Sequence, residues 1–192
     1  QLQPYTLSRI QGVNLILGAK EKFELFRHAG NWEQSEEAEI RVGPIQQAGE
    51  FGHASTAGFA DRTRAFLKIQ DGCDFNCSFC TIPLARGESR SVAVSEVVSQ
   101  ARTIASEGYR EIVLTGVNVG DYGKKIGTSL PALLKELVRI DELQRLRISS
   151  IEPNLLDDEL LDFWLASPKI CKHFHIPLQA GSNEVLKGMR RR

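Results

Sequence analysis

Short apolar runs alternate along this chain with segments whose apolar residues recur at helical spacing. The run at 65–69 predicts a buried strand. Residues 94–107 place their apolar side chains on one helical face, which predicts a helix with Ser95 as its N-cap and Gly108 as its end. The sequence therefore predicts a strand, a loop and a helix, which is the repeating unit of α/β folds.

The same unit recurs three times in the residues that follow. We expect strands at 111–117, 146–153 and 173–179, and helices at 130–140, 157–167 and from Ser182 onward. Strands and helices that alternate at this spacing favour a parallel sheet with right-handed crossovers. No reversal of strand order is evident, so we expect a partial (βα) barrel, although periodicity alone does not separate it from a doubly wound sheet.

The first sixty residues differ from this pattern. A strand at 13–18 and a helix at 20–28 suggest one fragment of another α/β unit within residues 1–30. Residues 31–60 contain several glycines and are predicted to be a linker. The barrel-like core then comprises 61–192.

Three cysteines stand together in DGCDFNCSFC, at Cys73, Cys77 and Cys80, and the one other cysteine is Cys171. Their loop follows a predicted strand and precedes a helix, which is the carboxyl end of the sheet where α/β folds bind ligands. Three thiolates can hold three irons of a cubane cluster and leave the fourth iron open to a small molecule.

Zinc is the alternative occupant of this cysteine motif. It would need Cys171 or a histidine as fourth ligand. A disulfide framework fits less well, because cysteines are few and nothing marks the chain as secreted. We expect Cys171 to be a buried free cysteine.

The strings KIQDGCDFNCSFCTIPLARGESRS, GYREIVLTGVNVGDYG, RISSIEP and HFHIPLQAGSNEVLKGMRR occur in this order from about residue 62 to the end. With these motifs the chain resembles the radical S-adenosylmethionine (SAM) methylthiotransferases, and most of all those that act on threonylcarbamoyladenosine in tRNA. The branches that act on isopentenyladenosine or on a ribosomal protein are similar around the cysteines and remain alternatives.

The resemblance implies a [4Fe-4S] cluster on the three cysteines, with the open iron chelating the amino and carboxylate groups of SAM. An electron from the cluster, supplied by a donor protein, would cleave the cofactor to an adenosyl radical. The expected reaction adds a methylthio group to C2 of N6-threonylcarbamoyladenosine next to the anticodon. Phe75 and Phe79 would either shield the cluster or simply pack within the loop.

Polar residues near the predicted strand ends are the candidate cofactor contacts. By resemblance, the backbone at Thr115 and Gly116 would approach the methionine amino group. Ser150 and Glu152 are expected to share one face of a strand, since alternate residues do so. His175 and Gln179 are polar groups in an apolar run and need partners. Each of these residues could instead serve packing or the turn of the chain: Thr115, Gly116, Ser150, Glu152, His175 and Gln179.

Two arginines follow the cysteines. Arg86 and Arg90 could each pair with a carboxylate or with a tRNA phosphate. Either could also be an ordinary surface arginine.

By resemblance, residues 1–30 would be the remnant of an amino-terminal methylthiotransferase domain whose own cysteines hold a second [4Fe-4S] cluster. No cysteine precedes Cys73, so the ligands of that cluster are not in this sequence. The usual carboxy-terminal RNA-binding module is not evident either. We therefore expect a truncated piece that is inactive on its own.

Composition narrows these hypotheses only slightly. The 192 residues are 42% hydrophobic, enough for one core and a small appendage. Twenty-four basic residues balance 24 acidic ones, and the dense basic cluster is Arg190–Arg192, so tRNA enters as a partner by resemblance alone. Nothing resembles a signal peptide or a membrane span, and we expect a cytoplasmic protein. Another radical enzyme and a non-catalytic zinc scaffold remain alternatives.

Overall fold

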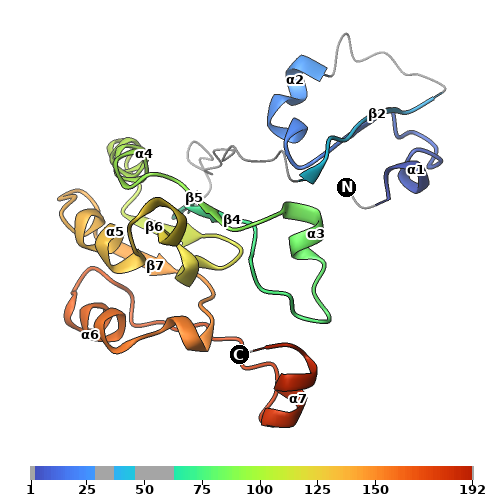
Figure 1. Ribbon diagram of the computed structural model, residues 1–192. Helices are drawn as coiled ribbons and strands as arrows, with labels where there is room; N and C mark the ends of the chain where they lie inside the picture. The colour runs from blue at the N-terminus through green and yellow to red at the C-terminus, as the bar shows by residue number, and fades with distance from the viewer. Residues whose placement is uncertain (1–2, 29–36, 46–62, 192) are drawn as a thin grey trace.

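A parallel sheet forms the centre of the larger part of the molecule (Figure 1). The computed structural model describes residues 3–28, 37–45 and 63–191. Strands β3 (Ala65–Lys68), β6 (Glu111–Thr115) and β7 (Arg145–Ile148) lie in the order β3-β6-β7, and both pairs are parallel. The predicted parallel α/β fold is confirmed, and neighbours in chain order are what a barrel segment requires.

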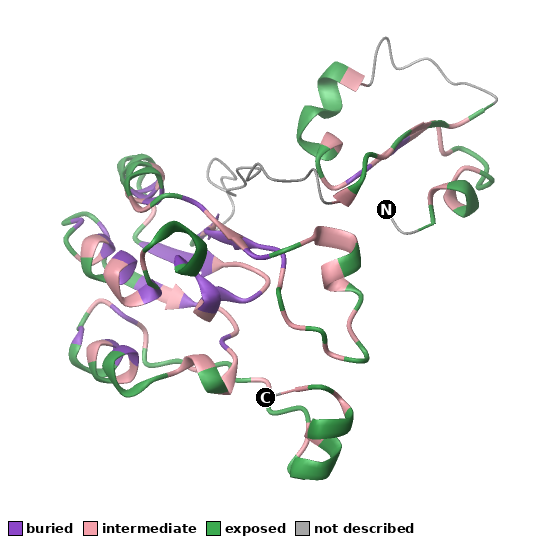
Figure 2. Cartoon of the chain, in the orientation of Figure 1, coloured by how far each residue is buried: buried purple, intermediate pink, exposed green. Residues whose placement is uncertain are grey.

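Helices α4 (Val94–Ser106), α5 (Leu130–Leu137) and α6 (Asp158–Ala166) follow β5 (Arg90–Ser91), β6 and β7 and lie along one side of the sheet (Figure 1). Their apolar faces and the strand side chains make one core, in which buried residues gather on the sheet and on the helix faces turned toward it (Figure 2). Each fully buried large aliphatic side chain in such a core contributes about 2 kcal/mol. This core holds the strand ends, and thus the site, in place.

Helix α4 corrects one predicted cap and confirms one predicted end. Its N-cap is Ala93, which offers no side-chain cap, whereas the predicted cap Ser95 already lies in the first turn. The helix begins early because the buried Val92 directly before Ala93 anchors the chain in the core. Gly108, with a φ of 96°, follows the last turn as predicted.

The predicted fourth strand at 173–179 is wrong. These residues form no strand, and only an isolated bridge from Ile170 to Leu146 continues the sheet past β7. The physical reason is that β7 ends at Ile148, short of the predicted Pro153, so later residues find little strand to pair with. Pro177 also has no N–H for a ladder. The last helix, α7 (Asn183–Gly188), forms as expected.

A short antiparallel pair was not foreseen. Strand β4 (Gln70–Asp71) pairs with β5 (Arg90–Ser91), and helix α3 (Ile82–Arg86) lies between them. The loop after β6 also contains two 3-10 turns, η3 (Val119–Asp121) and η4 (Lys124–Ile126), and a third, η5 (Pro153–Leu155), follows β7. Elements of two to five residues carry no readable periodicity.

The amino-terminal unit contains α1 (Pro4–Leu7), β1 (Leu15–Leu17), η1 (Glu21–Glu24), α2 (Leu25–His28) and β2 (Glu39–Arg41). Strands β1 and β2 pair in parallel. The strand predicted at 13–18 forms as β1, and the helix predicted at 20–28 forms as η1 followed by α2. Strand β2 falls inside the range predicted as a linker; residues 31–36 and 46–60 of that range lie outside the described residues. Within the described ranges, no helix is both long and apolar enough to cross a membrane.

Candidate iron-sulfur cluster site

The three clustered cysteines lie on the loop between β4 and α3, beyond the carboxyl end of β3. All three are partly buried and free of disulfides. The Cys73 N–H donates to the Gly87 carbonyl at 3.1 Å, and the Cys80 N–H donates to the Cys77 carbonyl at 3.1 Å. The first of these bonds joins the two ends of the loop, and the second folds the stretch between two of the thiols.

The thiols are close enough to influence one another. Burial raises the pKa of the Cys73 thiol, although a hydrogen bond from the Phe75 N–H to its sulfur at 3.4 Å acts in the opposite direction. Negative charge on Cys77 and Cys80 raises the pKa of Cys73 further. A positive group among these sulfurs would stabilise all three thiolates at once.

The donor set fits an iron–sulfur cluster. In the ranges that the structure describes, no three Cys, His, Asp or Glu side chains already converge as ligands of one metal ion. A cubane, in contrast, takes one thiolate at each of several irons. Three unpaired, mutually interacting thiols on one loop suit that arrangement, and Cys73, Cys77 and Cys80 would be its ligands.

The neck of the cysteine loop is narrow because of Gly72. Its φ is 71°, and a side chain there would overlap the backbone of Glu88, which lies between α3 and β5. Opposite it, the Ser89 N–H donates to the Asp74 carboxylate at 2.9 Å. The two sides of the loop therefore approach as closely as backbone allows.

Asp71 anchors this neck. Its carboxylate is buried and accepts from Lys68 at 2.6 Å, Arg86 at 3.1 Å and Arg90 at 3.2 Å, and from the Gly72 N–H at 2.9 Å. Burial alone would raise the pKa of Asp71, but the Lys68 bond and charge, with Gly72 and Arg86, hold it below its ordinary value. Arg86 and Arg90 were each expected to pair with a carboxylate or with a tRNA phosphate, and in the structure both pair with a carboxylate.

Gln70 connects the cysteine loop to the end of β6. It is fully buried; its amide donates to the Gly72 carbonyl at 2.7 Å and to the Ser89 hydroxyl at 3.0 Å, and its Oε1 accepts from the Asn118 N–H at 2.8 Å. Gly116 is close beside it: a Cβ there would lie 2.9 Å from Gln70 Oε1. Sequence reasoning missed Gln70, and the available signal was a polar residue at the end of an apolar run.

Two polar atoms at the carboxyl end of the sheet are buried without a hydrogen-bond partner in the described structure. They are Asn118 Oδ1, three residues past β6, and Ser149 Oγ, directly past β7. Buried polar atoms are rarely left unpaired, so both suggest contact with a ligand. The sequence had pointed to Thr115 and Ser150, near neighbours of these two.

The predicted face shared by Ser150 and Glu152 is wrong, because β7 ends at Ile148 and both residues lie beyond the strand. The Ser150 hydroxyl is 2.6 Å from Nδ1 of His175, so the structure does join two of the candidates. Glu152 instead forms an ion pair with Arg191. Gln179 has a φ of 68° and is exposed, apart from that pair.

The carboxy-terminal helix reaches the cysteine loop. The Ser78 N–H donates to the Met189 carbonyl at 2.9 Å, and Arg191 donates to the Pro177 carbonyl at 2.6 Å. Cys171 lies elsewhere, where its carbonyl accepts from the Trp164 indole at 2.8 Å. It is free, as expected, but only partly buried, so the predicted burial is wrong. The end of α7 therefore contacts the cysteine loop, and the sequence did not predict this contact.

Comparison with known proteins places the chain in a family. Residues 67–192 match the family model of the Radical SAM superfamily. The chain is 40% identical to the threonylcarbamoyladenosine tRNA methylthiotransferase MtaB of Bacillus subtilis, covering 100% of this chain and 43% of that protein. The Aquifex aeolicus protein of the same name is 37% identical, covering 100% and 47%. A tRNA-2-methylthio-N(6)-dimethylallyladenosine synthase of Wolinella succinogenes is 34% identical, covering 96% and 42%.

A solved structure resembles the fold. It is the radical S-adenosylmethionine methyltransferase TsrM of Kitasatospora setae, with cobalamin and a [4Fe-4S] cluster bound. The TM-score is 0.55 at 21% identity, covering 66% of this chain and 24% of that one.

The chain spans less than half the length of the three curated relatives named above.

Proposed function

The chain belongs to the Radical SAM superfamily, and we propose that it is the cluster- and cofactor-binding part of a tRNA methylthiotransferase. One observation carries the proposal: three free thiols lie on one loop at the carboxyl end of a parallel sheet. Cys73, Cys77 and Cys80 would hold the [4Fe-4S] cluster. When bound, that cluster supplies the electron that cleaves S-adenosylmethionine.

The chain's own residues would position the cofactor at the strand ends. Asn118 Oδ1 and Ser149 Oγ are buried acceptors that need partners, and the polar groups of a bound cofactor would provide them. The hydrogen-bonded Ser150 and His175 lie beyond the same edge of the sheet. Contacts from Thr115, Gly116, Glu152 and Gln179 remain predictions.

The substrate we propose is N6-threonylcarbamoyladenosine in tRNA, modified at C2. The support is the full-length match of this chain to proteins named for that activity at 37–40% identity. The dimethylallyladenosine branch is the second candidate, because a relative named for it is 34% identical. No cysteine precedes Cys73, so a second cluster would need ligands from outside these residues, and we infer that this piece does not transfer sulfur by itself.

Anaerobic reconstitution with iron and sulfide tests the cluster. We expect about four irons per chain and an electron paramagnetic resonance spectrum of the reduced protein that changes when S-adenosylmethionine is added. Cys77→Ser should lose most of the iron, while Cys171→Ser, the matched control, should retain it. Stoichiometric zinc with no iron uptake would reject the proposal.

Binding of short anticodon hairpins tests the substrate. A hairpin that carries threonylcarbamoyladenosine should bind more tightly than one that carries dimethylallyladenosine, with the unmodified hairpin as control. The reverse order would favour the second branch.

A further inference from the structure

A cavity of about 500 Å³ lies between the amino-terminal unit and helix α3. Leu7 and Leu17 supply apolar wall from the first side, and Ala85 from the second. Two cationic side chains border it, Lys22 on η1 and Arg86 at the end of α3. No cysteine lines the cavity, so it is separate from the cluster site.

Positive charge accumulates around this cavity. Arg86 shares the Asp71 carboxylate with Lys68 and Arg90. Lys22 joins the same group, since its ammonium lies 4.9 Å from the centre of the Phe23 ring and that of Lys68 lies 5.5 Å from the same ring. Three cations therefore contact one buried carboxylate, and a fourth, Lys22, is close enough to feel their charge.

Lys22 is affected both by burial and by the charges around Asp71. The pKa of Lys22 is lowered, first by burial and next by the charge of Lys68. Asp71 acts in the opposite direction, but Arg86 and Arg90 lower the pKa further. A lysine held among like charges is unfavourable, and an added anion would relieve it.

Three other carboxylates lie nearby. Glu21, next to Lys22, accepts from the Gly43 N–H at 3.2 Å through Oε1, and its Oε2 is buried without a partner among the described residues. Asp74 and Glu88, on the cysteine loop and just after α3, pair with Lys125 at 3.0 Å and 2.8 Å. Arg86, by contrast, uses Nη1 for Asp71 and carries further N–H donors on its guanidinium.

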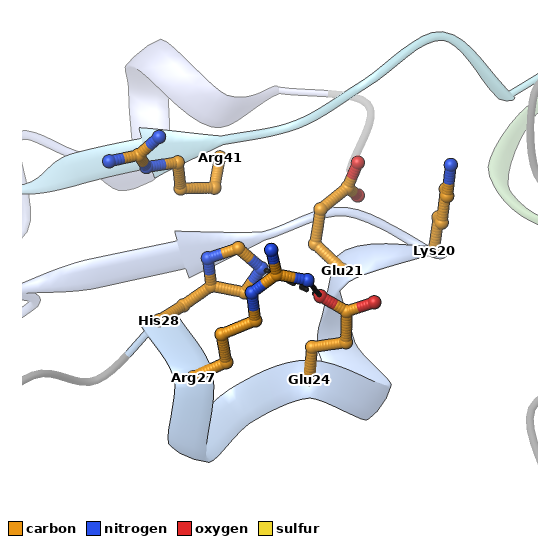
Figure 3. A pocket seen from close by; sticks show the side chains of 6 residues that line it. All are labelled: Lys20, Glu21, Glu24, Arg27, His28 and Arg41. Carbon is orange, nitrogen blue, oxygen red and sulfur yellow. Dashed lines mark hydrogen bonds and ion pairs between the residues drawn. The ribbon is translucent and has the colours of Figure 1, made fainter.

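The neighbouring pocket in Figure 3 makes a useful contrast. Its six lining side chains are all titratable, but they include both signs of charge. Glu24 accepts from Arg27 at 2.9 Å and lies 3.7 Å from His28, while Arg41 pairs with Glu39 at 2.7 Å. That pocket contains carboxylates among its own lining side chains, whereas the side chains that line the cavity beside α3 include two cations and no carboxylate.

We propose that the cavity between η1 and α3 binds a phosphate group through Lys22 and Arg86, and that a phosphodiester of the RNA substrate occupies it. The RNA part rests on the proposed function. An arginine fork with a lysine point charge is a common way to hold phosphate. Such a contact would position the RNA backbone without reading its sequence.

Inorganic phosphate is the first probe. At constant ionic strength, replacing chloride by phosphate should raise the melting temperature of the chain, because a ligand that binds only the folded state stabilises it. Lys22→Gln should abolish this rise, and Lys22→Arg should restore it. Lys20→Gln, two residues away and lining the other pocket, is the matched control and should behave as wild type. A rise that persists in Lys22→Gln would overturn the site.

An unmodified tRNA transcript is the second probe, followed by fluorescence anisotropy over a range of salt concentrations. Lys22→Gln should weaken binding several-fold and reduce the slope of log affinity against log salt by about 1, while Lys20→Gln leaves the slope unchanged. A phosphate effect without a change in slope would show a small phosphorylated ligand instead and overturn the RNA occupant. Iron content and the SAM-dependent spectrum should be unaffected by Lys22→Gln, which separates failure here from failure of the cluster assignment.

Discussion

Two carboxylates in this molecule each gather three cations, at opposite ends of the central sheet. Glu111 begins β6, and its partners are Arg64 at 3.9 Å, Arg145 at 2.8 Å and Arg147 at 3.2 Å. Asp71 lies beyond the other end of the sheet. The partners of Glu111 flank or belong to neighbouring strands, so this cluster joins β3, β6 and β7.

The two clusters differ in exposure and purpose. The arginine side chains at 64 and 145 are 50% and 55% exposed, so water screens their excess charge. Arg147, the third partner of Glu111, is 28% exposed. At Asp71, Lys68 and Arg90 are only 15% exposed and Arg86 is 40% exposed, while the exposed Lys22 lies within reach of their charge. The Glu111 cluster therefore joins neighbouring strands, whereas the Asp71 cluster places an excess of positive charge beside the cysteine loop. An excess of positive charge is typical of sites that bind anionic ligands.

The largest expected effect is at Asp71. Asp71→Asn leaves three cations beside a neutral amide, and breaking a buried pair in this way costs about 4 kcal/mol. Urea unfolding of the reduced, metal-free chain measures the loss. Asp74→Asn, at a half-exposed ion pair three residues on, should cost less than about 1 kcal/mol. Equal effects would mean that Asp71 does not anchor the neck.

Gly72 sharpens the comparison through the backbone. Gly72→Ala adds a Cβ that overlaps Glu88 at a positive φ, and we expect a loss of about 3 kcal/mol. Gly108→Ala, also at positive φ but with open space around it, should cost about 1 kcal/mol. Thermal or urea unfolding of both variants measures the difference, and similar losses would show that the neck can widen freely.

Glu111→Gln tests the other end and should cost about 2 kcal/mol at neutral pH. Hydrogen bonds from Arg145 and Arg147 outweigh burial and lower the pKa of Glu111. Its contribution is thus complete above the ordinary carboxyl pKa and is lost as the pH falls through the lowered value of the folded state. The stability gap between wild type and variant should shrink over that acidic range; a gap independent of pH would contradict the assignment.

Arg145→Gln should have the smallest effect, about 0.5 kcal/mol, because an exposed ion pair contributes little. High salt should reduce even this difference. Urea unfolding at low and high salt provides the measurement. A loss as large as that of Glu111→Gln would show that this single arginine, rather than the shared network, fastens the strands.

The repeating strand and helix pattern predicted most of the fold, because apolar spacing reports which faces are buried. It failed at 173–179, because β7 ends at Ile148 and the sheet continues past it only as the isolated bridge between Leu146 and Ile170. It also failed at Ser95, because the buried Val92 anchors the chain so that the N-cap is Ala93, two residues earlier than the cap expected from side-chain chemistry. Strand pairing and helix starts depend on neighbours in space, which a single window of sequence does not contain.

The sequence by itself determined the chemistry: three thiols at a fixed spacing, on a loop that must follow a strand and precede a helix. Chain connectivity fixes those facts. Only the tertiary structure decided which groups surround the loop, since Gln70, Asn118 and Met189 reach it from separate elements. The same holds for charge: the sequence is neutral overall, and folding alone brings Lys22 and Arg86 to one cavity. Electrostatic energy depends on distance in space, and that distance is set by packing.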